Sequence, residues 1–531
     1  MKYFSVAGPF LFLTFGAVLY SGEGPEELAR ARMLAQQYCS SCHMQPPPDI
    51  LPKDKWEFVT TWMGNFLGHG NTRGPYSNLI RPDQIPPEPL ISKDELELIQ
   101  RFYTTSAPEA SPPQENKPRL RRDLELFKSS PARLLSAGSL ITLVKIDPQN
   151  KRLFVGDGDN RQLLVFGENG GLKERHKVGS QPISLTLDGR NFYLTLIGDL
   201  DRDRGKGQVI YYNRSGNNYS LQNLVPHYYR IAHAAHHDIN LDGRRDIIIS
   251  AFGDYRYGRF SWFENQERGR LEEHILIERS GALKSAVHDF NRDGLPDLMV
   301  LMAQGRNELL LFINKGEGRF EQKQVFEKFP GFGFNDFHLA DFNSDGLMDL
   351  ITVNGNNMEI PDPPLRNYHG VRLYENTGRM DFKESFFYPM FGAIRAVSAD
   401  FDQDGDLDIA AVSYFPDWSA DCPETFVFLA NQGHYEFTPY TLEESCWGRW
   451  LTLDAGDLDG DGDQDLVLGN GFNLSGIPER FQSEFIRKSR KTQSVLILKN
   501  NLSEGVNRWI TSTSRKNASL PNPSSECRKP S

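Results

Sequence analysis

The pattern of apolar and polar positions indicates that most of the chain consists of short β-strands. From about residue 136 to 512, apolar and β-branched runs such as 141–147 (ITLVKID) and 191–197 (NFYLTLI) alternate with turns rich in Asp, Asn and Gly. Runs of this length that end in such turns are typical of half-buried or buried strands. We therefore expect an all-β unit in this part of the chain.

Ahead of the strands, two segments have the periodicity of helices. Residues 26–38 (EELARARMLAQQY) are rich in Ala, Leu and Glu, and 91–103 (ISKDELELIQRFY) has apolar residues at helical spacing. Ser92, with Glu95 three residues later, predicts a capping box at the start of the second helix. Residues 112–135 are mostly polar and contain several prolines, which favours a linker.

Five of the turns carry one acidic pattern, D-x-[DN]-x-D-G-x-x-D, that recurs about every 50 residues, as in repeat architectures. Carboxylates this close repel one another unless a cation lies among them, and Ca²⁺ is bound in proteins by such oxygen clusters. The loops are not EF-hands, because the closing Glu is missing; in the last copy Leu468 stands there. The alternative is a set of acidic turns without an ion. The candidate ligands are Asp238, Asn240, Asp242, Asp246, Asp289, Asn291, Asp293, Asp297, Asp341, Asn343, Asp345, Asp349, Asp400, Asp402, Asp404, Asp408, Asp457, Asp459, Asp461 and Asp465.

Two further repeats, between residues 136 and 212, have the same strand layout without the acidic loop, so that we expect seven repeats. In the acidic repeats a later strand ends in an Asn-x-Gly or similar turn, as at 376–378. Together these features resemble the FG-GAP/VCBS repeat family over about residues 136 to 512. The resemblance implies a Ca²⁺-binding β-propeller with up to five ions, and no ion in the first two repeats.

The helical part contains the pattern Cys39-Ser-Ser-Cys42-His43, which is the attachment motif of c-type haem. Two thiols add to the haem vinyl groups, and the adjacent imidazole reaches the iron as proximal ligand. The stretch resembles a small cytochrome c domain with one covalent haem c. For the sixth iron position Met63 is the main candidate, and His69 or an open site are the alternatives. The Met lies closer to the motif than such domains usually have it.

Composition and the N-terminus place the protein outside the cytoplasm. Lys2 precedes the apolar run 9–20 (PFLFLTFGAVLY), as in a secretory signal, and an uncleaved N-terminal anchor is the alternative and the only membrane contact that we expect. We expect the protein to be periplasmic or extracellular. The net charge is −11 and there is no basic face, which argues against nucleic-acid binding. Cys422 and Cys446 can form a disulfide there, or remain buried thiols.

Two further features could carry function. The insertion at 354–370 is long and rich in proline, so that it either lines a functional face or is a surface excursion. Histidines stand just before several acidic loops, with Lys, Arg and Asp at equivalent places. They either line a funnel that binds a substrate or second metal, or pack against their own loops. These residues are His233, His236, His237, His288, His338, Lys284, Asp336, Arg395 and Asp454.

The sequence thus predicts a mainly β chain, a seven-bladed β-propeller of FG-GAP/VCBS type preceded by a small all-α cytochrome c domain. The expected parts are a signal peptide or anchor (1–21), a cytochrome c domain (22–111), a linker (112–135), the propeller (136–512) and a disordered tail (513–531). The first functional hypothesis is an exported electron-transfer protein with a redox partner protein and a Ca²⁺-stabilised scaffold. The alternatives are a haem-dependent oxidoreductase with a small-molecule substrate in the funnel, and an adhesion or glycan-binding propeller.

Overall fold

The fold is described by a computed structural model that covers residues 25–74, 80, 82–130, 138–200, 204–216, 218–255, 257–490 and 492–502. The expected signal at 1–21 and the expected tail at 513–531 lie outside the described residues. Among the described residues, no helix is long and apolar enough to cross a membrane.

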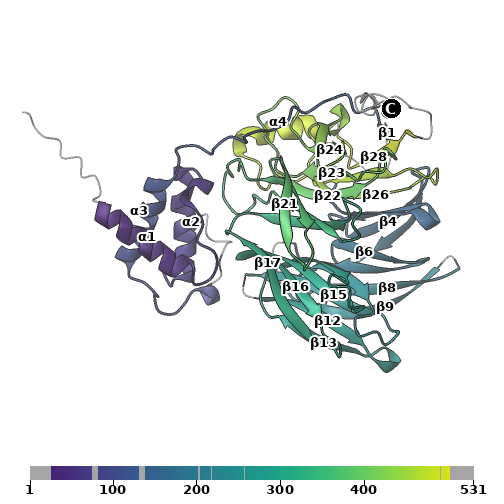
Figure 1. The fold of residues 1–531 in the computed structure, drawn as a ribbon, viewed down its shortest axis with the longest axis horizontal. Coiled ribbons are helices and arrows are strands. Elements are labelled where there is room, and N and C mark those ends of the chain that lie inside the picture. Colours follow the sequence, from purple (N-terminus) through teal and green to yellow (C-terminus); the bar gives the residue numbers. More distant parts are fainter. Residues whose placement is uncertain are drawn as a thin grey trace, which may run out of the picture.

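A small helical unit stands at one side of a large β-structure (Figure 1). It consists of α1 (Pro25–Cys39), α2 (Lys53–Phe66) and α3 (Lys93–Ser106), and α3 packs on both other helices. The expected capping box at the start of α3 is confirmed: the Glu95 amide donates to the Ser92 hydroxyl, and the Glu95 carboxylate accepts from the Ser92 amide. The core of the unit includes Trp56, whose ring stacks on that of Tyr103 at 4.1 Å.

The β-structure is a propeller of seven four-stranded antiparallel sheets, as the repeat count predicts. Blade 1 contains β2 (Ile141–Asp147), β3 (Arg152–Asp157), β4 (Gln162–Gly167) and β5 (Leu172–Lys177). Blade 2 contains β6 (Pro182–Asp188), β7 (Asn191–Leu196), β8 (Gly207–Ser215) and β9 (Asn218–Tyr228). Blade 3 contains β10 (Ile231–His237), β11 (Asp246–Asp254), β12 (Tyr257–Asn265) and β13 (Leu271–Ile277).

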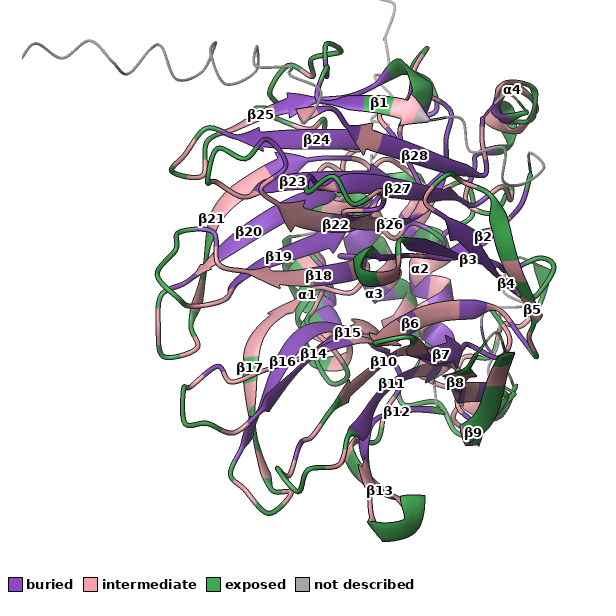
Figure 2. Cartoon of the chain, turned by 90° about the vertical axis from the view of Figure 1, so that its right-hand side faces the viewer, coloured by how far each residue is buried: buried purple, intermediate pink, exposed green. Residues whose placement is uncertain are grey.

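The remaining four blades follow the same order. Blade 4 contains β14 (Ala282–His288), β15 (Asp297–Gln304), β16 (Arg306–Asn314) and β17 (Phe320–Lys328). Blade 5 contains β18 (Phe334–Ala340), β19 (Asp349–Asn354), β20 (Gly370–Asn376) and β21 (Phe382–Pro389). Blade 6 contains β22 (Ala393–Ala399), β23 (Asp408–Ser413), β24 (Phe426–Asn431) and β25 (Phe437–Tyr440). Blade 7 contains β26 (Trp450–Gly456), β27 (Asp465–Asn470), β28 (Val495–Asn500) and β1 (Phe127–Ser130). The first strand of each blade is its innermost strand, and the seven first strands lie around the centre of the ring (Figure 2).

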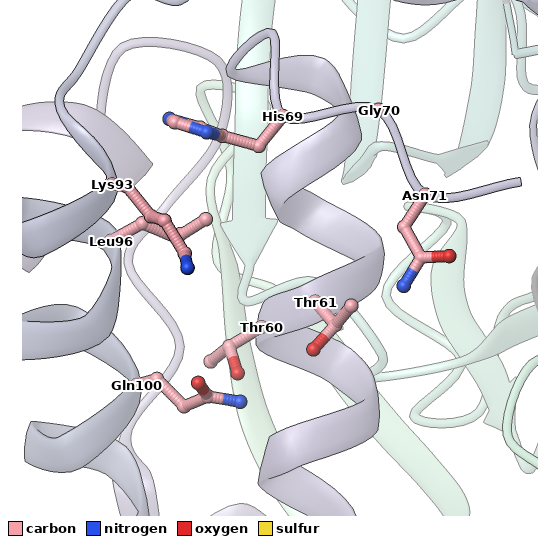
Figure 3. A pocket seen from close by; sticks show the side chains of 8 residues that line it. All are labelled: Thr60, Thr61, His69, Gly70, Asn71, Lys93, Leu96 and Gln100. Atoms are coloured by element: carbon pink, nitrogen blue, oxygen red, sulfur yellow. The ribbon is translucent and has the colours of Figure 1, made fainter.

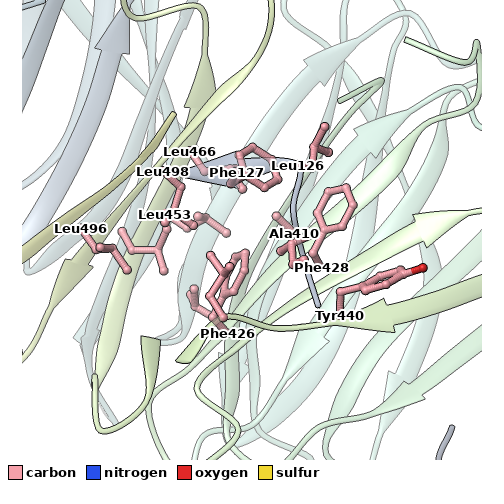
Figure 4. Packing of buried hydrophobic residues seen from close by; sticks show 14 of the residues in the cluster. Leu126, Phe127, Ala410, Phe426, Phe428, Tyr440, Leu453, Leu466, Leu496 and Leu498 are labelled. Carbon is pink, nitrogen blue, oxygen red and sulfur yellow. The ribbon is translucent and has the colours of Figure 1, made fainter. Parts of the chain in front are cut away.

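The outer strand of blade 7 comes from the segment that we expected to be a linker. β1 pairs antiparallel with β28, so that the residues before the first blade close the ring onto the last one. Figure 4 shows Phe127 and Leu126 of this segment in the cluster between blades 6 and 7. The rings of Phe401 and Phe428 lie 5.7 and 5.5 Å from that of Phe127. The expected linker at 112–135 is therefore partly a structural element of the propeller.

Every first strand has a β-bulge at the same place. In all seven blades the pairing with the second strand shifts between the first and the third residue of the inner strand. A bulge changes the direction of the side chains next to it. The third residue of each inner strand therefore occupies an equivalent place around the centre of the ring.

The acidic loops and the helical unit lie at opposite faces of the propeller. Each acidic loop joins the first strand of its blade to the second. The connection from the second strand to the third is at the other face, where Tyr255, between β11 and β12, meets the helical unit. Seen from the far side, α1–α3 lie behind the centre of the ring (Figure 2), and Figure 1 shows them beside one face.

Three long connections form an extra layer at that same face. They come from blades 5, 6 and 7 and include the insertion 354–370 and the helix α4 (Glu479–Ser489). Trp418 and Phe485 are buried against each other in this layer, and Cys422 forms a disulfide with Cys446. Short 3-10 turns lie at Pro48–Ile50, Pro82–Gln84, Pro148–Asn150, Glu267–Gly269 and Glu443–Ser445.

Candidate functional site

The cysteine motif lies at the end of α1 and in the turn that follows. Cys39 is the last residue of the helix, and the His43 amide donates to the Cys39 carbonyl at 3.4 Å, which keeps the motif as a compact turn. Both thiols are free, Cys39 half-buried and Cys42 exposed. Burial raises the pKa of the Cys39 thiol, which contacts the Tyr103 hydroxyl. The two thiols are therefore not joined in a disulfide, and burial favours the neutral thiol form of Cys39.

The imidazole of His43 is in the state that an iron ligand needs. Its Nδ1 lies 3.0 Å from the Met44 carbonyl oxygen. Because a carbonyl only accepts, Nδ1 carries the proton and Nε2 has the free lone pair. Burial is the main cause that lowers the pKa of His43, so that the ring is neutral near pH 7. This donor set fits c-type haem: two free thiols and one neutral Nε2 within a single turn.

The motif is held against the propeller. The Arg306 guanidinium donates through Nε to the Cys42 carbonyl at 2.8 Å, and the Met44 amide donates to the Glu327 carboxylate at 3.3 Å. Arg306 begins β16 and Glu327 lies near the end of β17, both in blade 4. Sequence reasoning did not find these two residues, because nothing in a strand end reveals which distant turn it will meet.

Aromatic and apolar contacts complete the junction between the two parts. The ring of Trp62 on α2 meets Tyr255 edge-on at 5.8 Å. Ile360, from the insertion 354–370, packs among the core residues of the helical unit, and Asp362 of the same insertion pairs with Lys55 at 3.5 Å. The insertion therefore lines the face that contacts the helices, rather than being a plain surface excursion.

The two candidates for the sixth iron position lie on different parts of the helical unit. Met63 is half-buried on α2, two turns after Trp56 and so on the same side of the helix. His69 follows α2, and its Nε2 lies 2.9 Å from the Ile91 carbonyl oxygen. His69 also lines a cavity of about 390 Å³ between α2 and α3, into which Leu96 and Gln100 point (Figure 3). Among the described residues, no hydrogen bond or ring contact joins Met63 or His69 to His43.

Four of the acidic loops share one hydrogen-bonding scheme, and in the fifth the Asp457 carboxylate accepts from the amides of Gly460 and Gly462. In the first, the Asp238 carboxylate accepts from the amides of Asp242 and Gly243 at 3.0 and 2.8 Å. Asp246 is fully buried and accepts from the amides of Ile239 and Asn265 at 2.9 and 2.8 Å. The last Asp thus anchors its loop to the blade, and each oxygen keeps a lone pair for an ion. The closing residues Asp297, Asp349, Asp408 and Asp465 accept corresponding amides.

The loops differ at their second oxygen-bearing position. In the first three loops an Asn amide donates to the next Asp, at 3.1 Å between Asn240 and Asp242, and Asn291 and Asn343 repeat this contact. The last two loops have Asp there. As a result, three carboxylates converge within 4.8 Å in each: Asp400, Asp402 and Asp404 in one loop, and Asp457, Asp459 and Asp465 in the other. Burial and the neighbouring Asp404 raise the pKa of Asp402 to about 7.

Three of the five histidines near the loops are explained by local packing. His236 stacks on Tyr193 at 3.9 Å, the Nδ1 of His237 lies 3.1 Å from the Asp238 carbonyl oxygen, and His288 meets the ring of Phe290 at 5.1 Å. His233 and His338 instead stand with Lys284, Asp336 and Arg395 on the inner strands.

Comparison with known proteins bears on the repeats. The FG-GAP-like repeat matches residues 238–300 and 289–352. No curated protein matches the chain. Among solved structures, the chain is similar to BBS1N from its complex with ARL6DN in a lead-soaked crystal (11% identity, 72% of this chain and 97% of that chain, TM-score 0.42). It is also similar to U3-55K (12% identity, 71% and 99%, TM-score 0.40). A third similar structure is the Pan2 WD40 domain of Neurospora crassa (9% identity, 72% and 97%, TM-score 0.42). The chain thus carries FG-GAP-like repeats within a seven-bladed β-propeller.

Proposed function

We propose that the protein is an exported electron-transfer protein that carries one covalent haem c on its helical unit. The observation that carries this proposal is the turn 39–43, with two free thiols and a neutral imidazole whose Nε2 is available. When bound, the haem supplies a one-electron carrier. Cys39 and Cys42 would hold it by thioether bonds, and His43 would offer Nε2 to the iron. Met63 is the proposed second protein ligand, with His69 or an open position as alternatives.

The propeller acts in this proposal as a scaffold that orients the helical unit. Arg306 and Glu327 fix the backbone on both sides of His43, so that the imidazole keeps its tautomer and direction. Ca²⁺ in the acidic loops stabilises the opposite face. The redox partner is a protein that approaches the helical unit from the side that the propeller leaves open.

An oxidising compartment is part of the same proposal. The disulfide between Cys422 and Cys446 supports it, because such bonds persist outside the cytoplasm. The apolar run at 9–20 is the proposed export signal or N-terminal anchor.

A second candidate function is a haem-dependent oxidoreductase with its substrate in the central channel. The position of α1–α3 on the axis of the ring favours it, since a substrate in the channel would lie beneath the helical unit (Figure 2). Reduction of the haem by a substrate from a panel of alcohols, sugars and acids, without a protein donor, distinguishes this enzyme from a pure carrier. The adhesion or glycan-binding alternative rests only on the likeness of the repeats.

The test of the main proposal is covalent haem attachment in a host that exports and matures c-type cytochromes. We expect haem that stays with the chain in a denaturing gel, and that is lost in a variant with Cys39→Ala and Cys42→Ala. Ser40→Ala, in the same turn, is the matched control and keeps the haem. A folded wild-type propeller that carries no covalent haem under these conditions contradicts the proposal.

A further inference from the structure

A group of ionisable side chains lies on the inner strands of four consecutive blades. The third residue of each inner strand, directly after the bulge, is His233 in blade 3, Lys284 in blade 4, Asp336 in blade 5 and Arg395 in blade 6. Residues at this place in the other blades are uncharged: Thr452, Leu143 and Ser184. These four residues therefore form an arc around one side of the centre of the ring.

Contacts between blades show that these side chains meet. Lys284 Nζ lies 2.6 Å from one Asp336 oxygen, and an Arg395 nitrogen lies 3.9 Å from the other. His233 Nδ1 lies 3.4 Å from the backbone nitrogen of Ser285 in the next blade. Because that amide donates to Nδ1, the proton of the His233 ring is on Nε2, which is thus a hydrogen-bond donor.

Two residues further along, a second set of inner-strand side chains points the same way, since side chains alternate along a strand. Lys145 of blade 1 pairs with Asp454 of blade 7 at 3.0 Å. His338 of blade 5 stands across the ring, near enough for Lys145 and Lys284 to lower its pKa, after burial as the main cause. At these two places of the described inner strands there are thus three cations, Lys145, Lys284 and Arg395, against the two carboxylates Asp336 and Asp454.

The channel therefore has an excess positive charge in a chain whose net charge is −11. Asp336 is almost fully buried and is already satisfied by Lys284, whereas the Arg395 side chain is 38% exposed and only loosely paired. Among the described residues, no acceptor lies within hydrogen-bonding distance of the Arg395 guanidinium. Burial and the nearby Lys284 and Arg395 lower the pKa of His233 to about 3, so that its ring stays neutral and adds no charge of its own.

We infer that the central channel holds a small oxyanion, a carboxylate or an inorganic oxyanion, between Arg395, Lys284 and His233. Arg395 offers a planar pair of donors that suits two oxygens of one anion, and Lys284 and His233 Nε2 supply further donors. A metal ion is disfavoured in the central channel, because Lys284 and Arg395 repel a cation. The site does not depend on haem, so that absence of haem from the helical unit leaves this inference standing.

The test is titration of the full-length protein with sodium acetate and, separately, with sodium sulfate. Phosphate is avoided because it precipitates Ca²⁺. Calorimetry measures affinity, and NMR of histidine-labelled protein locates binding. We expect saturable binding of at least one anion, with chemical-shift changes at His233 and His338. The anion that binds more tightly, acetate or sulfate, shows whether the site prefers a carboxylate or an inorganic oxyanion. Glycerol, a neutral probe, gives no binding.

Arg395→Gln removes the loosely paired cation without leaving a buried charge alone, and we expect a loss of affinity of tenfold or more. Arg395→Lys keeps the charge and retains part of the affinity. Arg319→Gln, at a side chain that is 70% exposed, is the matched control and leaves binding unchanged. Equal affinity in wild type and Arg395→Gln, or shifts confined to exposed histidines such as His237, identifies an adventitious ion only and overturns the inference. Absence of saturable binding of both anions overturns it as well, and the wild-type NMR decides the question even if Arg395→Gln does not fold.

Discussion

Replacing Asp402 by Asn separates two effects of a carboxylate in an acidic loop: it repels the neighbouring carboxylates, and it contributes to the binding of Ca²⁺. Asp402 is buried and converges with Asp400 and Asp404 within 4.8 Å. The unfolding is measured at roughly pH 8, because Asp402, whose pKa is raised to about 7, is ionised only above that pH. Two unit charges at that distance then repel by roughly 3.5 kcal/mol at an effective dielectric constant of about 20. Asp404 is exposed, and screening by water reduces the effect on stability to about 1–2 kcal/mol. The amide that the substitution introduces can donate to Asp404, as Asn240 does to Asp242.

We therefore expect Asp402→Asn to raise stability in EDTA and to reduce the gain in stability that Ca²⁺ brings. In EDTA the variant unfolds at a higher denaturant concentration than wild type, by about 1–2 kcal/mol, because the repulsion is relieved. At Ca²⁺ a hundredfold above its Kd, one site contributes about 2.7 kcal/mol, and a tenfold weaker site contributes about 1.4 kcal/mol less. The gain on adding Ca²⁺ is therefore smaller in the variant. The assay is denaturant unfolding followed by tryptophan fluorescence, in EDTA and in Ca²⁺.

The matched control is Asp406→Asn, which removes the same charge from the same loop at a side chain outside the converging group. We expect it to leave the Ca²⁺-dependent gain unchanged. The reasoning is refuted if Asp402→Asn lowers stability in EDTA, or if its gain from Ca²⁺ equals that of wild type.

Two further predictions concern how the propeller is closed and covered. Phe127→Ala removes a buried ring from the closing strand β1 and should lower the free energy of unfolding by about 3–5 kcal/mol. Glu125→Ala, at an exposed position of the same segment, should change it by no more than about 0.5 kcal/mol. Equal effects of the two substitutions in thermal unfolding would show that β1 is dispensable. The double substitution Cys422→Ser and Cys446→Ser removes a disulfide between residues 24 apart in sequence and should lower the free energy of unfolding by about 3 kcal/mol. The expected result is a lower melting temperature, which a reductant no longer changes. A variant that melts like oxidised wild type would show that the disulfide does not constrain the unfolded chain.

The repeats could be read from the sequence because each carries its own signal. Strand, acidic loop and turn recur within each blade, so that local chemistry and global fold agree, and the capping box at Ser92 is equally local. β1 could not be found in this way. Its four residues, FKSS, have no strand pattern of their own, and they form a strand only because β28 offers them a partner.

The turn 39–43 can be found from the sequence, whereas its surroundings cannot. Cys39, Cys42 and His43 are adjacent in sequence, so that their pattern is visible without a fold. Arg306 and Glu327 meet them only through the docking of two separate parts of the chain, and no periodicity encodes that contact. Lys145 was missed as a channel residue because blade 1 has no acidic loop to mark its inner strand.

The pairing of β1 with β28 also sets an order of events during synthesis. The turn 39–43 and β1 emerge long before Val495–Asn500, so that the ring stays open until the end of the chain is available. Blade 4, whose Arg306 and Glu327 cover the turn, likewise emerges later than the turn itself. If the protein carries haem as proposed, an attaching enzyme would therefore have a period in which the two thiols are accessible and the propeller does not yet cover them. Once the ring has closed, the segment between α3 and β1 connects the helical unit directly to blade 7.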